Sequence, residues 1–421
     1  MKSANNGARV LVVGAGFAGL ATMSRLARGG MRVTLADRHI YSTFQPLLYQ
    51  VATAGLAPSD VAYPLRSFAH KYGARFRHGE LASVDAAARV AEFGDGGRFE
   101  YDYLILAVGV TAGFYGITGA AEHSHALYTL NDASTLRERI LAGLEKLSLE
   151  SARQDVTVTI VGGGATGVEL AGTLAELRNI GLPASYPDID PQCVHIRLVE
   201  QAPALLTPYV PTLQEYARHQ LVKRGVDLHL NATIKEITAD RLILADGQEL
   251  PSNLTAWAAG VAGPPMAGKW GLPQGKGGRL LVGRDLRVEG QDRIFAIGDI
   301  ALVDGHPVPQ LARPALQMGR HAALQIRRLE AGQDPVPFSY HDKGTMATIG
   351  SRSAVVQLNH GIRLRGTIAW LAWLGLHLVT LLGGRNRSTT LINLSSRYLS
   401  WRRGGGIIVG DDAPAQSAEG D

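Results

Sequence analysis

The stretch Val161-Gly162-Gly163-Gly164-Ala165-Thr166-Gly167-Val168-Glu169 decides the fold, because it repeats an earlier one, Val13-Gly14-Ala15-Gly16-Phe17-Ala18-Gly19. Each stretch follows a short apolar, β-branched run and opens a helix-compatible segment. In a strand–turn–helix unit, the first glycine makes the tight turn, the second lets the backbone approach a pyrophosphate, and the third lets helix and strand pack closely. The helix N-terminus then offers free N–H groups to the anion. Two such turns predict two dinucleotide sites; two purely structural turns are the alternative.

Composition places the chain among globular proteins of more than one domain. Its 421 residues predict two or three domains, and its 50 glycines fit a fold with many tight turns. The formal net charge is only +5, and no basic run interleaved with aromatics precedes the C-terminal region, so nucleic acid is not an expected partner. The polar Met1–Ala8 lacks the features of a signal or transit peptide, which predicts a protein that faces the cytosol.

The single cysteine limits the redox chemistry of the chain. Cys193 begins the alternating run Cys193–Val199 and is expected to be a core residue of a strand. One cysteine excludes an intramolecular disulfide, a Cys-x-x-Cys pair and an iron–sulfur site within this chain. No metal site is expected, so electrons that leave the bound dinucleotides must go to an acceptor outside the chain.

An acidic residue stands at the end of the second strand of each dinucleotide unit. Asp37 follows the predicted strand Arg32–Ala36 and is expected to bind the ribose hydroxyls, with a simple turn aspartate as the alternative. Glu200 has the same place in the second unit, although it lies further from the glycine turn than the usual ~20 residues. We attribute the excess to an inserted loop over 179–192. A carboxylate at the ribose would repel the 2′-phosphate of NADPH, so NADH is the expected substrate.

Later strands predict how the chain closes its domains. Tyr103–Gly109 is typical of a buried parallel strand, and Leu254–Val261 is expected to close the second domain. Arg293–Asp299 is then expected to return to the first domain. Because this late strand adds Asp299 to the first site, we assign the flavin to that site. The predicted fold class is α/β, with two Rossmann-like dinucleotide-binding domains, for FAD and NADH, and a C-terminal membrane-associating helical segment. The predicted boundaries are 1–118 and 264–330 for the FAD domain, 119–263 for the NADH domain and 331–421 for the C-terminal segment.

The C-terminal segment contains an apolar helix that is too short to cross a bilayer. Thr367–Leu382 is apolar on nearly all sides and includes His377. At ~1.5 Å per residue it would be about 24 Å long, against a hydrocarbon core of ~30 Å. We therefore expect it to lie in the membrane interface rather than to span the membrane.

A second helix is predicted after Gly383-Gly384. One face of it would carry Leu391, Leu394, Tyr398 and Trp401. Arginines flank both helices, at Arg363, Arg365, Arg385, Arg387, Arg397, Arg402 and Arg403. Aromatic residues with flanking arginines suit helices that lie on an anionic membrane; a buried helix pair, in the core or between two subunits, is the alternative. The last stretch, Gly410–Asp421, is expected to be disordered.

Two dinucleotide sites in one chain indicate a flavin and a nicotinamide. Hydride is expected to pass from NADH to N5 of the FAD, with the protein aligning the two cofactors. Since no acceptor can reside in the chain itself and the C-terminal segment favours a membrane, a lipid-soluble quinone is the expected acceptor.

The motifs of this chain resemble those of the type II NADH dehydrogenases, the single-subunit NADH:quinone oxidoreductases. The resemblance covers most of the chain, although the glycine turns alone would fit any pyridine-nucleotide flavoprotein. It rests on Val13–Leu20, Phe44–Leu56, Gly162–Gly172, Trp257–Val261, Ile297–Asp299, Ala312–Gln317, Lys343–Gly350 and the Trp-rich C-terminal stretch.

The resemblance implies a non-proton-pumping enzyme of the respiratory chain that reduces a membrane quinone by two electrons. It also implies a homodimer held peripherally on the cytoplasmic face of the cell membrane. The implied FAD contacts are Gly14, Gly16, Phe17, Ala18, Gly19, Asp37, Arg38, Leu81, Ala107, Gly109, Asp299 and Ala312. The implied NADH contacts are Gly162, Gly164, Gly167, Glu169 and Glu200.

The resemblance further implies two catalytic residues, Glu169 and Gln317. Glu169 would lie near the nicotinamide and flavin and take part in proton handling, whereas its alternative role is that of a first-turn acid supporting the helix dipole. Gln317 would border the quinone. Arg313 departs from the family, which usually has a glutamine there, and would add a fixed positive charge near the quinone. Lys343 is either a further polar group at this site or a surface lysine of a turn.

Three rival functions remain open at this point. A sulfide:quinone oxidoreductase has a similar layout, but its chemistry needs reactive cysteines. A soluble NADH-dependent reductase of a small redox protein would lack the Trp-rich C-terminal segment. A non-catalytic redox-sensing flavoprotein would keep both glycine turns.

Overall fold

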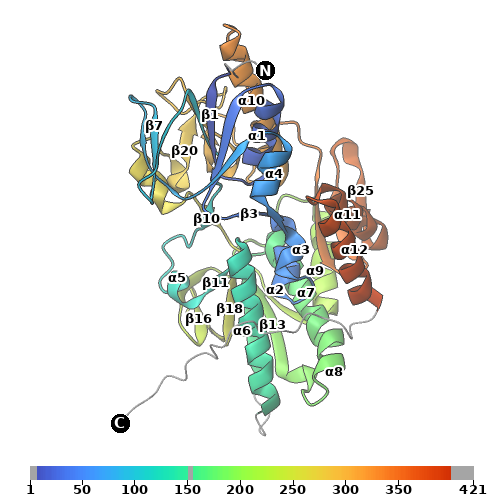
Figure 1. Cartoon of the computed structure of the whole chain (residues 1–421). Helices are drawn as coiled ribbons and strands as arrows, with labels where there is room; N and C mark the ends of the chain where they lie inside the picture. Colours follow the sequence, from blue (N-terminus) through green and yellow to red (C-terminus); the bar gives the residue numbers. More distant parts are fainter. Residues whose placement is uncertain (1–6, 150–154, 400–421) are drawn as a thin grey trace. The chain divides into compact units, whose positions relative to one another are not determined.

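This computed structural model describes residues 7–149 and 155–399, which form two compact units. The first contains the described residues of Met1–Thr43, Ala62–Gly113 and Gly260–Gly344; the second contains those of Phe44–Val61, Phe114–Ala259 and Thr345–Asp421. Each unit holds one glycine turn and one five-stranded parallel sheet (Figure 1). The α/β class with Rossmann-like sheets is thus confirmed.

The first unit is organised around its parallel sheet, whose strand order is β21-β9-β1-β2-β5. The late strand β21 pairs with β9, so the chain returns to the first sheet as predicted. Helix α1 (Phe17–Arg28) follows the glycine turn and packs against α10 (Ala312–Glu330), where the Thr22 hydroxyl donates to the Gly319 carbonyl at 2.9 Å. The strands are β1 (Arg9–Val13), β2 (Arg32–Asp37), β5 (Arg75–His78), β9 (Tyr103–Leu106) and β21 (Ile294–Ala296).

Smaller sheets and one helix complete the first unit. The antiparallel sheet β6-β7-β8 lies between β5 and β9 in the chain. Its strands and the remaining elements are β6 (Leu81–Asp85), β7 (Val90–Phe93), β8 (Arg98–Glu100), β3 (Tyr41–Thr43), β4 (Ala62–Pro64), α4 (Leu65–Lys71), β10 (Thr111–Ala112), β19 (Val261–Ala262), β20 (Leu280–Val282) and β22 (Ala301–Val303).

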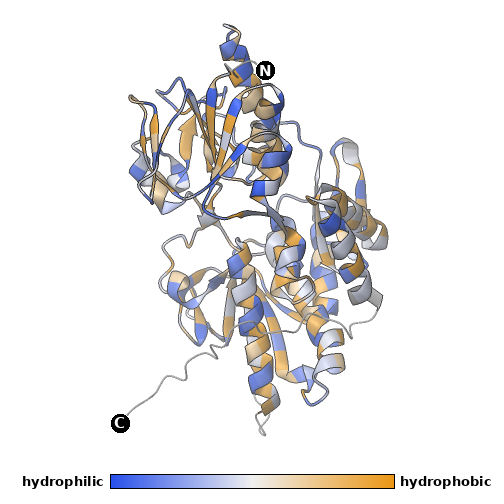
Figure 2. Ribbon diagram, viewed as in Figure 1, coloured by the Kyte–Doolittle hydropathy of each residue, from blue (hydrophilic) through white to orange (hydrophobic). Residues whose placement is uncertain are grey.

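The second unit repeats this plan with the strand order β11-β18-β12-β13-β14. Figure 2 shows apolar residues along its strands and a mixed pattern on its helices, which is the pattern of a sheet covered by amphipathic helices. The strands are β11 (His125–Ala126), β12 (Val156–Val161), β13 (Val194–Val199), β14 (Val226–His229) and β18 (Leu254–Trp257). The helices are α2 (Leu48–Ala52), α3 (Pro58–Val61), α5 (Ala120–His123), α6 (Leu130–Leu149), α7 (Ala165–Glu176) and α9 (Pro211–Lys223), and a side sheet comprises β15 (Ile234–Ile237), β16 (Arg241–Leu244) and β17 (Glu249–Pro251).

The predicted loop over 179–192 is largely helical. Helix α7 continues through a π-helical turn, Leu177–Gly181, into α8 (Leu182–Ser185). Leu182 is buried in a cluster with Leu144 and Ile189, which explains why this Pro-containing stretch does not remain a free loop. The strand predicted from Cys193 begins one residue later, at Val194, and Cys193 itself is a buried free thiol.

The C-terminal region of the second unit forms a three-stranded antiparallel sheet followed by two helices. The strands are β23 (Thr345–Gly350), β24 (Ser353–Gln357) and β25 (Arg363–Arg365), and the helices are α11 (Gly366–Thr380) and α12 (Gly384–Leu399). Strand β23 packs on α7, the helix that follows the second glycine turn, so this region belongs to the same unit as that turn. The predicted boundaries differ here, since they put this region in a separate segment, 331–421, and Phe44–Val61 in the FAD domain.

The two C-terminal helices have one buried side and one exposed side. On α11, Ala369 and Trp373 are buried whereas Ile368 is 68% exposed. On α12, Leu394 is buried but Leu391 is 47% exposed. The two residues were predicted to lie on one face, but their environments differ. The Tyr398 side chain, Trp401 and the stretch 410–421 lie outside the described residues. No helix within 7–149 and 155–399 has both the length and the apolarity needed to cross a membrane.

Candidate functional site

The two glycine turns have the same backbone geometry. Gly14 has φ +99° and Gly162 has φ +110°, in the region that favours glycine. A Cβ on Gly19 or Gly167 would collide with the carbonyl of Gly14 or Gly162, respectively, because each helix crosses close to its own turn. The first and third glycines of both motifs are therefore required by the fold.

The middle glycines leave open space where a phosphate would sit. A Cβ on Gly16 or Gly164 would meet nothing within 4 Å, and both residues are exposed. Each is the N-cap of its helix, without a side-chain cap and without an acid in the first turn. The N–H groups of both helix N-termini are thus available to an anion, and both turns fit a dinucleotide pyrophosphate. Since Glu169 lies beyond the first turn of α7, its alternative role as a first-turn acid is wrong.

The two predicted acidic residues hold the glycine turns in the same way. The Asp37 carboxylate accepts the backbone N–H of Ala15 at 2.6 Å and that of His39 at 2.7 Å. The Glu200 carboxylate accepts the N–H of Gly163 at 2.5 Å and that of Ala202 at 2.7 Å. Burial raises the pKa of Asp37, and the two backbone N–H donors oppose that rise. Each acid stands at the end of the second strand of its unit and binds the glycine turn that follows the neighbouring first strand. This is the position where a ribose would lie.

The other predicted FAD contacts also lie in the first unit. Arg38 forms an ion pair with Glu80 at 3.6 Å. The Leu81 carbonyl accepts the Trp270 indole N–H at 3.4 Å, and the Ala107 N–H donates to the Val13 carbonyl at 2.7 Å. Phe17 and Ala18 begin α1, Gly109 follows β9 with φ +70°, and Ala312 is the first residue of α10.

Asp299 presents a carboxylate that no other described residue binds. It follows β21, and only its backbone carbonyl accepts hydrogen bonds, from Arg279 Nε at 2.9 Å and Gln310 Nε2 at 3.3 Å. Burial raises the pKa of Asp299 to about 6, while the positive charge of Arg279 opposes the rise. A half-buried acceptor without a protein donor fits a role toward the hydroxyl groups of a flavin.

The predicted quinone residues lie at the start of α10 and in the segment that follows it. The Gln317 side-chain amide pairs with the backbone of His341, accepting its N–H at 3.0 Å and donating to its carbonyl at 2.9 Å. Gln317 thereby anchors the segment that leads to Lys343, which is exposed. Arg313 is half-buried in the first turn of α10. Burial and the neighbouring Asp342 raise the pKa of Tyr340, and the charge of Arg313 opposes that rise.

Glu169 is a buried acid, and no described cation contributes to its pKa. Its side chain lies in the second turn of α7 and is 8% exposed. Burial raises the pKa of Glu169 to about 8, so the carboxyl is largely protonated at neutral pH. The Thr348 backbone N–H, which donates to Oε1 at 3.2 Å, opposes this rise, and so does the nearby indole of Trp373.

The C-terminal hairpin closes over the face of α7 that carries Glu169. Glu169, Gly172 and Glu176 share this face at spacings i, i+3 and i+7. A Cβ on Gly172 would collide with the Ile349 carbonyl, so helix and hairpin are in backbone contact there. Glu176 Oε1 accepts the Ser351 N–H. Both buried acids of α7 thus bind backbone donors of the hairpin.

An aromatic group beside Glu169 was not identified from the sequence. His377 stacks on Trp373 with ring centroids 4.1 Å apart, and Phe44 contacts His377 edge-on at 6.1 Å. Tyr49 lies 6.2 Å from Trp373. Burial lowers the pKa of His377 to about 4, so its ring is neutral at neutral pH. The i, i+4 spacing of Trp373 and His377 on an apolar helix was the available signal.

Comparison with known proteins places these features in a family. Residues 8–319 match the model described as pyridine nucleotide-disulphide oxidoreductase. The type II NADH:quinone oxidoreductase Ndh of Mycobacterium tuberculosis is 34% identical, over 97% of this chain and 92% of that protein. The type II NADH:quinone oxidoreductase of Staphylococcus haemolyticus is 29% identical, over 82% of this chain and 89% of that protein.

Solved structures share the fold. NDH2 from Plasmodium falciparum in complex with NADH has a TM-score of 0.88 at 19% identity, covering 94% of this chain and 99% of that chain. The sulfide:quinone oxidoreductase from Aquifex aeolicus has a TM-score of 0.75, also at 19% identity, covering 94% of this chain and 96% of that chain. Identities this low establish the fold alone.

Proposed function

The chain belongs to the type II NADH:quinone oxidoreductases, and from this premise we propose that it reduces a membrane quinone while remaining on the membrane surface. It is an FAD-dependent NADH dehydrogenase. When bound, FAD supplies the two-electron carrier between nicotinamide and quinone. The protein residues bind and orient the reactants and supply the proton.

The two glycine turns are assigned to the two dinucleotides. In the first unit the open N-terminus of α1 would hold the FAD pyrophosphate, and Asp37 and Asp299 would face its hydroxyl groups. In the second unit the N-terminus of α7 would hold the NADH pyrophosphate, with Glu200 at the ribose. The Glu200 carboxylate favours NADH because it would repel the 2′-phosphate of NADPH.

Glu169 is the observation that carries the proposed mechanism. Reduction of a quinone to a quinol consumes two electrons and two protons, and NADH delivers only one proton equivalent with its electron pair. A buried carboxyl with a pKa of about 8 holds a proton at neutral pH. We assign Glu169 as the residue that holds and delivers a proton at Oε1 or Oε2, with Thr348 and Trp373 stabilising the carboxylate that remains.

Gln317, Arg313 and Lys343 are assigned to the quinone side of the flavin. Gln317 orders the approach to Lys343 through its two hydrogen bonds with His341. Arg313 would add a fixed positive charge that stabilises negative charge developing on the reduced flavin or the quinone. This charge distinguishes the chain from family members that have glutamine there.

The exposed apolar side of the C-terminal helices supports a peripheral position on the membrane. Ile368, Leu371 and Val379 on α11 are 68%, 56% and 69% exposed. Arginines at both helix starts would meet anionic headgroups: Arg363, Arg365, Arg385 and Arg387 are all exposed. A homodimer on the cytoplasmic face of the cell membrane, as part of the respiratory chain, completes the proposal.

Anaerobic stopped-flow spectroscopy of the purified flavoprotein tests this function. NADH is expected to bleach the flavin rapidly, NADPH slowly, and a short-chain quinone is expected to restore the colour rapidly. Arg313→Gln, which restores the residue usual in the family, should leave flavin bleaching unchanged and alter only the rate of reoxidation. Rapid bleaching followed by sluggish reoxidation with every quinone tested would overturn the assignment of the acceptor.

A further inference from the structure

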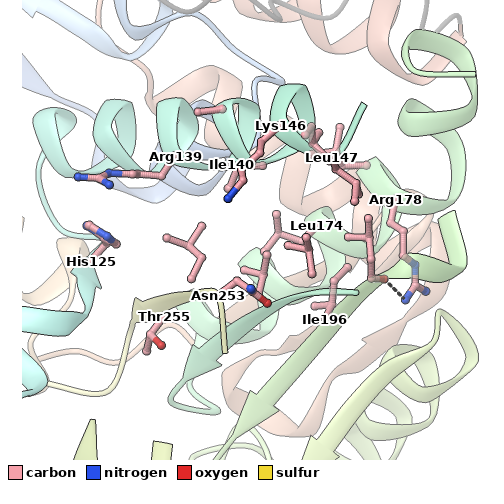
Figure 3. A pocket seen from close by; sticks show the side chains of 18 of the residues that line it. His125, Arg139, Ile140, Lys146, Leu147, Leu174, Arg178, Ile196, Asn253 and Thr255 are labelled. Carbon is pink, nitrogen blue, oxygen red and sulfur yellow. Dashed lines mark hydrogen bonds between the residues drawn. The ribbon is translucent and has the colours of Figure 1, made fainter. Parts of the chain in front are cut away.

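The second unit contains a cavity that none of the roles above uses. It has a volume of about 600 Å³ and lies between α6 and the sheet strands β12, β13 and β18, with the end of α7 at one side (Figure 3). Its volume falls within the ~300–1,000 Å³ typical of small-molecule sites. All of its lining residues belong to the second unit.

The cavity is separate from the proposed NADH site. It touches Val156 and Val158 in the first half of β12, and Leu174 and Leu177 where α7 ends. The glycine turn stands at the opposite end of both elements, after Val161 and before Ala165. Dinucleotides bind beyond the carboxyl ends of parallel strands, so a ligand here would not replace the nicotinamide cofactor.

The inner surface of the cavity is apolar. Its lining includes side chains from three sides, namely Ile140, Leu144 and Leu147 on α6, Leu174 on α7, and Val194 and Ile196 on β13. These side chains are each less than a tenth exposed, so the cavity reaches into the core of the unit. Such a surface suits a hydrocarbon chain.

Positive charge predominates at the edge of the cavity. Arg139, Lys146 and Arg178 line it, whereas Glu122 is the one carboxylate among its described lining residues. Arg178 is engaged with backbone carbonyls, including that of Gly225 at 3.1 Å, but the Arg139 guanidinium makes no hydrogen bond or ion pair with a described residue. In Figure 3, Arg139 and His125 lie at one end of the cavity. Burial lowers the pKa of His125, and the charge of Arg139 lowers it further, so the neutral imidazole is favoured beside the guanidinium.

A glycine keeps the cavity open on the α6 side. Gly143 lines the cavity between Arg139 and Lys146, at the i+4 spacing from Arg139 that places both on one face of the helix. A Cβ there would meet nothing within 4 Å, so no packing contact requires glycine. Glycine in a helix interior is unfavourable, and here it leaves space next to the guanidinium of Arg139, an exposed residue.

We propose that this cavity binds a single-chain fatty acid, with its carboxylate at Arg139 and its alkyl chain along the apolar inner surface. The guanidinium offers the bidentate geometry that carboxylates prefer. The positive edge of the cavity would repel an alkyl ammonium ion, and a neutral alcohol could not form an ion pair with Arg139. The proposal does not depend on the identity of the electron acceptor.

Isothermal titration of the flavin-loaded, full-length protein with dodecanoate, below its micellar concentration, tests the proposal. Dodecanoate should bind about tenfold or more tightly than dodecanol, and dodecyltrimethylammonium should not bind. Arg139→Glu should weaken dodecanoate binding about tenfold or more, because the carboxylate would then meet a like charge. Lys223→Glu, a charge reversal at an exposed residue of α9 that does not line the cavity, should have no effect.

Gly143→Leu separates a binding role from a structural one. The variant fills open space and removes an unfavourable helix glycine, so it should raise the melting temperature and abolish dodecanoate binding. Undiminished binding to Gly143→Leu would place the ligand elsewhere, for example on the exposed side of α11, and would overturn the proposal. Equal affinity for dodecanoate and dodecanol, or an Arg139→Glu variant that binds normally, would also overturn it.

Discussion

The carboxyl of Glu169 accepts the backbone N–H of Thr348 at 3.2 Å, although the two residues are 179 positions apart in the chain. This hydrogen bond joins α7, the helix that follows the second glycine turn, to the hairpin that precedes α11 and α12. The group proposed to hold the proton thus depends on the C-terminal region for the two neighbours that stabilise its charged form, the Thr348 N–H and the Trp373 indole.

Glu169→Gln tests the proton assignment, because glutamine copies the shape of the protonated acid. Flavin reduction by NADH should keep its rate, while reoxidation by quinone should slow about 100-fold, within the range of general acid catalysis. Stopped-flow measurement of the two half-reactions separates these effects. Equal slowing of both half-reactions would indicate a structural role instead.

The same variant has a defined pH dependence of stability. Because the folded pKa of Glu169 is raised from 4.5 to about 8, folding favours the protonated form. The free energy of unfolding of the wild type should therefore fall as pH rises from about 5 to 8. Glu169→Gln should not show the part of this fall that Glu169 causes. Melting temperatures from pH 5 to pH 9 should diverge in favour of the variant at high pH; parallel curves would contradict the raised pKa.

Trp373→Phe should make Glu169 harder to ionise. The indole lowers the pKa of Glu169, and its buried Nε1 has no hydrogen-bond partner among the described residues, so it is free to stabilise the carboxylate. Phenylalanine keeps most of the packing, so the pH profile of quinone reduction should shift to higher pH with little change in the KM for NADH. Trp370→Phe, on the same helix but packed in the cluster of Val356 and Ala369, is the control and should leave the profile unchanged.

Gly172→Ala should destabilise the protein although it replaces a helix glycine. Its Cβ would collide with the Ile349 carbonyl, which must then move away from α7 together with Thr348. We expect a loss of about 1–3 kcal/mol, as for overpacking of a core. Gly143→Ala, where the Cβ meets nothing, should instead gain up to about 1 kcal/mol. Chemical denaturation of both variants measures the contrast, and similar effects at the two sites would refute the close contact.

Asp299→Asn should raise the melting temperature of the flavin-free protein and weaken its binding of FAD. Burial raises the folded pKa of Asp299 from 3.8 to about 6, so ionisation weakens the folded state as pH rises through this range. At pH 7 the variant without flavin should therefore melt at a higher temperature than the wild type. Its FAD affinity should fall about tenfold, since an acceptor for the flavin loses its charge. Unchanged affinity by flavin fluorescence titration would remove Asp299 from the FAD site.

The triple substitution Ile368→Ser, Leu371→Ser and Val379→Ser tests the membrane surface. Co-sedimentation with vesicles containing phosphatidylglycerol should fall strongly, because three exposed apolar side chains no longer enter the interface. Turnover with a water-soluble quinone should stay near normal. Ile180→Ser, at another exposed apolar residue of the same unit, is the control. Full retention on vesicles by the triple variant would contradict the proposed surface.

Local sequence determined both dinucleotide turns and the acids that hold them. Each glycine requirement is set within a few residues, by a positive φ at Gly14 and Gly162 and by the crossing of each helix over its own turn. Asp37 could be located by its spacing from the glycine turn. Glu200, which follows β13 after an insertion that includes α8, could be located by the strand pattern alone. The prediction of a loop over 179–192 was wrong, because burial of Leu182 in a non-local cluster stabilises helical structure there.

Only the tertiary structure decided the surroundings of the candidate residues. The partners of Glu169, the pairing of Gln317 with the His341 backbone and the cavity beside Gly143 all depend on segments that meet only after folding. A backbone N–H that meets a carboxyl 179 residues away leaves no periodic or compositional signal in either segment. The sequence by itself therefore determined which cofactors the chain is built for. The tertiary structure decided the protonation of Glu169, because pKa depends on burial and on donors from distant parts of the chain.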